Sequence, residues 1–203
     1  MRADIQAQFD LRTNFNNLQP GSYLTGCDWS HWQPHALDAD MSDYDFFIHK
    51  VSEGVKFIDQ KCQDRVSQLH KNKPCILYHF FNALCDGEKQ ARHFMETMHS
   101  LFSGARVGFC VDFEITETEA QLESLTAFMV KMKDYGHVPI IYCGDYSKAR
   151  LTAAAFHAPL WIARWRKGKP NTFCSLWQFS NTPYDLDLFF GSMDEMSLLL
   201  EWV

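Results

Sequence analysis

Two acidic residues, Asp112 and Glu114, end an apolar run in the middle of the chain. If this run is a β-strand, residues two apart project from the same face, with attachment points ~6–7 Å apart. Such a pair suits glycoside hydrolysis, in which one carboxyl group protonates the leaving oxygen and the other stabilises or attacks the positive charge at the sugar carbon. Crowding also disfavours ionisation of both groups. We therefore predict that Glu114, the longer side chain, donates the proton.

Two more acids are expected at the same site. An Asp-x-Glu pair alone is also explained by helix capping or by an ion pair at the surface. Asp28 and Asp185 lie in the first and last predicted strands and would face the same opening. Because like charges gathered in a cleft destabilise a fold, four converging carboxyl groups favour a functional site over a structural one. The predicted catalytic set is Asp28, Asp112, Glu114 and Asp185.

Aromatic residues near the predicted strand ends supply a surface for sugars, whose apolar faces stack on tyrosine and tryptophan. Core packing remains an alternative for Tyr78 and Trp165 and is the expected role of Trp161. A structural role is expected for Trp29, Trp32 and Trp202. Charged residues at the same predicted strand ends complete the set. The predicted substrate-binding residues are Lys50, Glu53, Tyr78, Tyr142, Trp165, Trp177 and Asp187.

Strand-like and helix-like segments alternate along the chain, as their apolar periodicity indicates. Thr116 and Glu119 are spaced as a capping box that opens a helix, and Gly136 closes it. Strands are predicted at 23–28, 45–51, 75–81, 106–113, 138–143, 159–164, 173–179 and 184–188. Helices are predicted at about 58–73, 91–102, 116–136, 146–156 and 193–202.

This alternation predicts an α/β fold with parallel strands joined by right-handed crossovers. Eight strands are enough to close a barrel of the TIM-like (β/α) kind. An open, doubly wound sheet is the alternative, since periodicity does not report closure. In such barrels the reactive groups lie at the carboxyl ends of the strands, where the acids and aromatics above are predicted.

Composition and charge narrow the function classes. The chain has 203 residues, 46% of them hydrophobic and 22% charged, which is typical of one globular domain. Its net charge of −6 and the lack of a basic stripe argue against a nucleic-acid partner. The longest apolar run, residues 75–81, is too short to cross a membrane. We therefore expect neither nucleic-acid binding nor membrane insertion.

The seven cysteines are scattered and include no Cys-x-x-Cys pair. Most lie in apolar runs, so we predict reduced core thiols formed in a reducing compartment. His31 and His35 are four residues apart, but Pro34 between them makes a shared helical face doubtful. No metal site is expected.

Eight segments, in this order, resemble the glycoside hydrolase family 25 lysozymes, the Chalaropsis-type N-acetylmuramidases. The similarity covers nearly everything after residue 22. The matching segments are 26–33 (GCDWSHWQ), 47–54 (FIHKVSEG), 77–81 (LYHFF), 111–114 (VDFE), 139–142 (PIIY), 160–163 (LWIA), 176–179 (LWQF) and 185–187 (DLD).

The resemblance implies a flattened barrel of eight strands and about five main helices, occupying residues 23–203. It also implies hydrolysis, without a cofactor, of the β-1,4 bond between N-acetylmuramic acid and N-acetylglucosamine in bacterial peptidoglycan. Glu114 would be the general acid, and Asp112 would orient the substrate acetamido group; a nucleophile or base role for Asp112 stays open. Asp187 stands where the family often has asparagine, so the last-strand carboxylate is either Asp185 or Asp187.

Several expectations concern the whole protein. Residues 1–22 are expected to be an N-terminal extension, and a monomer is expected. Without a signal-peptide pattern, the chain suits a phage endolysin made in the host cytoplasm, or a virion-associated lysin. The alternatives to a muramidase are an N-acetylglucosaminidase or chitinase-type glycosidase and a barrel that binds glycan without cleaving it.

Overall fold

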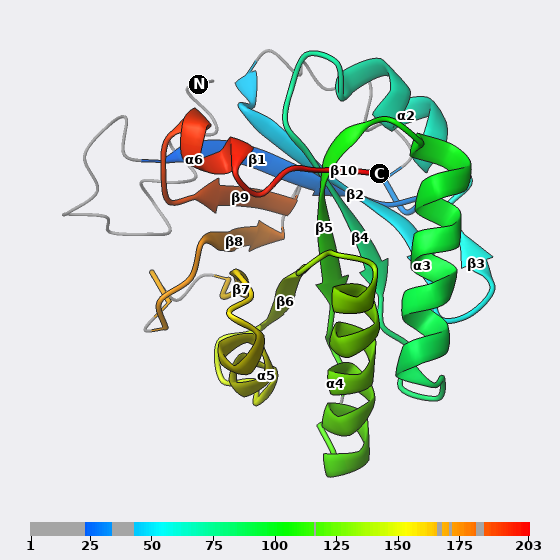
Figure 1. Cartoon of the computed structure of the whole chain (residues 1–203). Helices are drawn as coiled ribbons and strands as arrows, with labels where there is room; N and C mark the ends of the chain where they lie inside the picture. Colours follow the sequence, from blue (N-terminus) through cyan, green and yellow to red (C-terminus); the bar gives the residue numbers. More distant parts are fainter. Residues whose placement is uncertain (1–22, 34–42, 116, 166–167, 171, 182–184) are drawn as a thin grey trace.

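Eight strands close into a barrel in the computed structural model, which describes residues 23–33, 43–115, 117–165, 168–170, 172–181 and 185–203 (Figure 1). The order around the barrel is β1-β9-β8-β7-β6-β5-β4-β2, and pairing of β1 with β2 closes it. This closure confirms the α/β barrel and excludes the open sheet. The barrel strands are β1 (Leu24–Trp29), β2 (Phe46–Glu53), β4 (Cys75–Phe80), β5 (Arg106–Asp112), β6 (Ile140–Gly144), β7 (Leu160–Ala163), β8 (Leu176–Asn181) and β9 (Asp185–Phe189).

The strand β9 departs from the parallel pairing predicted for the sheet. It is antiparallel to both β8 and β1, whereas the other neighbours around the barrel are parallel. Only residues 182–184 separate β8 from β9, too few for the crossover that parallel strands require. As a result, β9 begins at the barrel end where the parallel strands finish.

Five helices are present in the described part of the chain: α2 (Cys62–Leu69), α3 (Gly87–Phe102), α4 (Glu119–Asp134), α5 (Ala149–Phe156) and α6 (Met193–Ser197). The two long helices, α3 and α4, lie side by side against the outside of the barrel (Figure 1). Apolar side chains fill the space between helices and strands, and a second cluster that includes Phe46, Ile76 and Met196 fills the barrel interior. The barrel is therefore a packed core that is open to ligands only at an end.

Local features correct three of the predictions. The capping box of α4 is formed by Thr118 and Gln121, while Thr116 lies outside the described residues, and Gly136 follows the helix with a positive φ of 91°. Residues 57–58 form the short strand β3 (Phe57–Ile58) on the edge of β2, so the helix predicted from 58 starts at Cys62. The last predicted helix stops at Ser197, and β10 (Glu201–Trp202) pairs with β5.

All seven cysteines are free, and six of them are buried. None of the helices described is long and apolar enough to cross a membrane. The predicted extension, residues 1–22, and the start of the last predicted strand, Tyr184, lie outside the described residues.

Candidate active site

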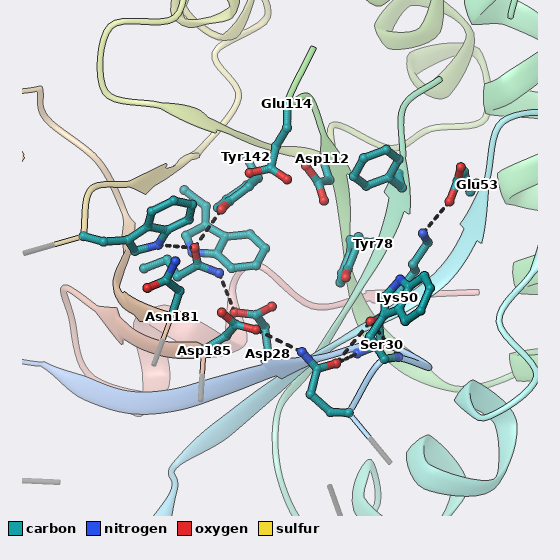
Figure 2. Close-up of a pocket in the computed structure, with 16 residues that line it drawn as sticks. Asp28, Ser30, Lys50, Glu53, Tyr78, Asp112, Glu114, Tyr142, Asn181 and Asp185 are labelled. Carbon is teal, nitrogen blue, oxygen red and sulfur yellow. Dashed lines mark hydrogen bonds and ion pairs between the residues drawn. The ribbon is translucent and has the colours of Figure 1, made fainter. Parts of the chain in front are cut away.

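A cleft of about 520 Å³ opens at the barrel end where the parallel strands finish. Figure 2 shows its 16 lining residues. They come from β1, β2, β4, β5, β6, β7, β8 and β9 and from the segments that follow several of these strands. The lining consists of Asp28, Ser30, Trp32, Gln33, Lys50, Glu53, Tyr78, Phe80, Asp112, Glu114, Tyr142, Trp161, Trp165, Gln178, Asn181 and Asp185.

Asp112 and Glu114 enter this cleft together. Asp112 is the last residue of β5, and the next residue, Phe113, is buried in the core, so the two acids flank an apolar anchor. Their carboxyl groups lie side by side near the Tyr142 hydroxyl (Figure 2). Asp112 is buried, and its Oδ1 has no hydrogen-bond partner among the described residues. Burial, and then the charge of Glu114, raise the pKa of Asp112.

Glu114 is more open to solvent than Asp112. Partial enclosure in the cleft raises its pKa, and the charge of Asp185 acts in the same direction. The neighbouring Tyr142 hydroxyl opposes the increase. A glutamic acid with a raised pKa that remains in contact with the cleft is suited to donating a proton.

Asp28 and Asp185 lie close to each other on the other side of the cleft (Figure 2). Asp185 is the first residue of the antiparallel strand β9, so it reaches the cleft from the amino end of its strand. Its Oδ2 accepts a hydrogen bond of 3.0 Å from Gln33 Nε2. Burial, followed by the charge of Asp185, raises the pKa of Asp28 to about 8.

Gln178 connects the two sides and was not among the predicted site residues. Its Oε1 accepts from the Tyr142 hydroxyl and from Trp165 Nε1, both at 2.7 Å. Its Nε2 donates to Asp28 Oδ2 at 2.7 Å. Since side chains alternate along a strand, the inward position of Gln178 turns its neighbour Trp177 outward.

Trp177, predicted to bind substrate, therefore faces away from the cleft and does not line it. Its side chain is 1% exposed, packs near Phe179 and Phe190, and donates to the Arg164 carbonyl. The prediction placed Trp177 in the cleft. Because side chains alternate along β8, the position that faces the cleft is held by the amide of Gln178. The alternating pattern of β8 was the signal that could have identified Gln178.

The floor of the cleft is aromatic. Tyr78, Tyr142 and Trp161 are nearly buried and pack ring against ring, with Tyr142 and Trp161 centroids 4.2 Å apart. Trp161 thus both fills the barrel core and lines the cleft. Trp165 is exposed and lines the cleft. Trp32, expected to be structural, is 77% exposed and also lines it. The site therefore combines acids with flat apolar surfaces.

Comparison with known proteins assigns the family. The sequence model of glycosyl hydrolases family 25 matches residues 27–188, which span the barrel from β1 to β9. The chain belongs to glycosyl hydrolase family 25. It is therefore a glycoside hydrolase, and Asp28, Asp112, Glu114 and Asp185 all lie within the matched segment. No curated protein matches the chain by sequence.

Solved structures share the family 25 fold of this chain. A muramidase from Acremonium alcalophilum is 23% identical, with a TM-score of 0.72 over 87% of this chain and 98% of that one. A bacterial lysozyme from Streptomyces coelicolor is 20% identical, with a TM-score of 0.70 over 87% and 96%. The catalytic domain of an endolysin from bacteriophage P40 of Listeria monocytogenes is 20% identical, with a TM-score of 0.68 over 87% and 96%.

Two further predicted residues form an ion pair on the wall of this family 25 cleft. Lys50 Nζ lies 2.5 Å from Glu53 Oε2. The ammonium group also lies over the rings of Phe57 and Phe80, at 5.3 and 4.6 Å from their centroids. Lys50 lowers the pKa of Asp112, which opposes the effects of burial and of the neighbouring acids. It is therefore the cation that partly offsets the acidic cleft.

Asp187, in contrast, does not contact the cleft as predicted. It is 0% exposed in the barrel interior, two residues beyond Asp185 on the same face of β9. Its Oδ1 accepts a hydrogen bond of 2.8 Å from Trp161 Nε1. Of the two acids proposed for the last-strand carboxylate, only Asp185 reaches the cavity.

A buried arginine fixes the segment that follows β1. Arg65 of α2 donates to the Ser30 carbonyl at 2.8 Å and also to the Gln33 carbonyl. On the same segment, the His31 backbone N–H donates to Asp59 at 2.8 Å. These contacts hold Gln33 and Trp32 over the cleft, which explains how Trp32 reaches it.

Proposed function

We propose that this chain is a lysozyme, an N-acetylmuramidase that cleaves the β-1,4 bond between N-acetylmuramic acid and N-acetylglucosamine in bacterial peptidoglycan. The observation that carries the proposal is the pair Asp112 and Glu114, side by side in a cleft that also holds the carboxyl groups of Asp28 and Asp185 and has an aromatic floor. Three of the solved structures that share its fold are named muramidase, lysozyme and endolysin.

Glu114 is the proposed general acid. Its raised pKa keeps it protonated at higher pH than an ordinary glutamic acid, and its position in the cleft brings it to the leaving oxygen. When the glycosidic C–O bond breaks, the proton of Glu114 moves to that oxygen, and the leaving sugar departs as an alcohol. The same carboxylate then accepts a proton from the water that completes hydrolysis.

Asp112 is proposed to orient the substrate's own acetamido group. Its buried Oδ1 lacks a donor within the described chain, so it is available to accept the acetamido N–H. The acetamido oxygen then bonds to the anomeric carbon as the leaving group departs, and the negative charge of Asp112 stabilises the positive charge that develops. Water reopens this ring, and the product retains the anomeric configuration.

Asp28 and Asp185 are proposed to set the charge of the cleft, and Tyr78, Tyr142, Trp161 and Trp165 to contact the sugar rings. A sugar ring presents apolar faces and polar edges, which the aromatic rings and carboxyl groups of the cleft match. The steps use groups of the chain, the substrate and water.

The products of wall digestion test the proposal. Purified peptidoglycan is digested with the protein, reduced with borohydride and hydrolysed. Muramitol as the new reduced end would support a muramidase, whereas glucosaminitol would overturn it in favour of an N-acetylglucosaminidase. Glycan binding without a new reducing end would overturn hydrolysis altogether. Digestion by Glu114→Gln serves as the control for contaminating enzymes.

A further inference from the structure

Asp187 lies directly below the catalytic acids without taking part in the steps above. In the antiparallel pairing of β1 with β9, Asp187 is opposite Gly26. Gly26 has no side chain, and a Cβ there would lie 2.4 Å from the Phe46 ring. Asp28 is therefore the next side chain on that face of β1. Asp28 and Asp187 are thus diagonal neighbours on the inner face of the barrel, and the charge of Asp28 helps to raise the pKa of Asp187, after burial.

Two neighbouring carboxyl groups can hydrogen-bond to each other only when one of them carries a proton. The other partners of the two groups indicate which oxygen is available to carry it. Asp28 Oδ2 must be an acceptor, because Gln178 uses its Oε1 for Tyr142 and Trp165 and directs Nε2 at Asp28. Asp187 Oδ1 is also an acceptor, for Trp161 Nε1.

Two oxygens remain. Asp28 Oδ1 is not one of the buried atoms without a partner, whereas Asp187 Oδ2 is buried and has no donor among the described residues. As a hydroxyl it would donate to Asp28 and need no donor of its own. As a carboxylate oxygen it would be a buried charge without compensation, which is costly. No lysine, arginine or histidine in the described part of the chain forms an ion pair with either acid.

We propose that Asp187 is a positioning residue that holds a proton and donates it in a hydrogen bond to Asp28, which keeps Asp28 oriented and limits the negative charge beneath the cleft. The expected effect of Asp187 on catalysis rests on the proposed function, whereas the presence of a proton on Asp187 does not. The side chains around the pair are Cys27 and Asp28 of β1, Tyr78 of β4, Glu114 after β5, Tyr142 of β6, Trp161 of β7, Gln178 of β8 and Asp185 of β9. The lysine that lines the cleft, Lys50 of β2, is paired with Glu53.

Asp187→Asn is the informative variant. An asparagine can accept from Trp161 through its carbonyl and donate to Asp28 through its amide, so it reproduces the protonated acid at every pH. Asp187→Leu has a similar volume and can do neither. For Asp187→Asn we expect lysis within about threefold of wild type at mildly acidic pH, and for Asp187→Leu a loss of roughly tenfold or more.

The pH dependence of thermal unfolding tests whether Asp187 holds a proton, and this measurement needs no substrate. Burial raises the pKa of Asp187 in the folded state, so wild type loses stability relative to Asp187→Asn as pH rises. The Tm of the variant should therefore gain on that of wild type by roughly 3 °C per pH unit as pH rises from the ordinary value of 3.8 toward the raised pKa of Asp187. Infrared spectra should also show that the variant lacks a protonated carboxyl band of wild type.

A Tm difference that does not change with pH, or an unchanged carboxyl band, would overturn the inference. Loss of lysis in Asp187→Asn as large as that in Asp187→Leu would overturn the positioning role. These measurements separate the two proposals. If the protein cleaves no peptidoglycan but shows the pH-dependent Tm difference, the proton on Asp187 is supported and the proposed function is overturned.

Discussion

Gln178 donates from Nε2 to Oδ2 of Asp28 across 2.7 Å, and this bond links the two sides of the cleft. The amide cannot turn over without losing this bond, because its oxygen already accepts from Tyr142 and Trp165. The Tyr142 hydroxyl in turn lies beside the carboxyl group of Glu114 (Figure 2). One neutral side chain therefore fixes the orientation of a carboxyl group and of the tyrosine beside the proposed general acid.

Replacing this amide should weaken both fold and activity. Gln178→Met keeps the approximate volume but leaves buried donors and an acceptor unpaired, so we expect a loss of about 1–3 kcal/mol in the free energy of unfolding. The rate of lysis should fall as well, because Asp28 and Tyr142 lose a common partner. Urea unfolding and turbidity assays measure the two effects. Gln68→Met, on the exposed face of α2, is the matched control and should change neither.

Removing the proposed general acid should abolish lysis without unfolding the protein. Glu114→Gln keeps the shape of the side chain but cannot donate an acidic proton, so the rate should fall by about 10²–10⁴-fold. Its Tm should stay close to that of wild type because Glu114 lies at the open side of the cleft. Glu123→Gln, on the exposed face of α4, controls for a general effect of lost charge. Substantial lysis by Glu114→Gln would contradict the assignment.

Asp112→Asn should lower the rate of lysis and raise the free energy of unfolding. The pKa of Asp112 is raised in the folded protein above its ordinary value of 3.8, so its contribution to stability is complete below that value and is lost as pH rises toward the folded pKa. Asparagine has no charge to bury, and at neutral pH we expect a gain of about 1–2 kcal/mol together with a large loss of lysis.

The pH range of this measurement matters, because two buried histidines act in the opposite direction. Burial lowers the pKa of His49 to about 4 and of His79 to about 3, so both cost stability as pH falls below their ordinary value of 6.5. Above about pH 6.5 they are neutral in both states, and the carboxyl groups set the slope. The two histidines contribute equally to wild type and to Asp112→Asn, so the difference in Tm between the two proteins reports Asp112. The Tm of the variant should gain on that of wild type as pH rises above 3.8 and should stop gaining once Asp112 is ionised in the folded protein; a Tm difference that does not change with pH would contradict a raised pKa.

Trp32 should contribute to substrate binding and not to stability. Its side chain is 77% exposed and lines the cleft, so Trp32→Ala removes a stacking surface while exposing little core. We expect KM for soluble glycan fragments to rise by roughly tenfold, in line with the worth of an aromatic stacking contact, and Tm to stay nearly constant. Trp202→Ala is the control, because Trp202 is 68% exposed on β10 and does not line the cleft. A similar change in KM for both variants would argue against a specific contact at Trp32.

The sequence by itself determined the acids and the elements that carry them. Asp112 and Glu114 follow an apolar strand with the spacing that puts both on one face, and Asp28 ends another such run. Apolar periodicity also located most strands and helices to within a few residues. These features depend on neighbours within one element, which is the range over which a sequence pattern reports structure.

Only the tertiary structure decided how the remaining residues meet. The antiparallel direction of β9 brings Asp185 to the cleft and leaves Asp187 below it, and the register of β8 gives the cleft Gln178 in place of Trp177. Arg65 places Trp32 over the opening from a helix that is distant in sequence. Strand direction, register and loop placement depend on contacts between segments far apart in the chain, and periodicity within a segment carries no record of them.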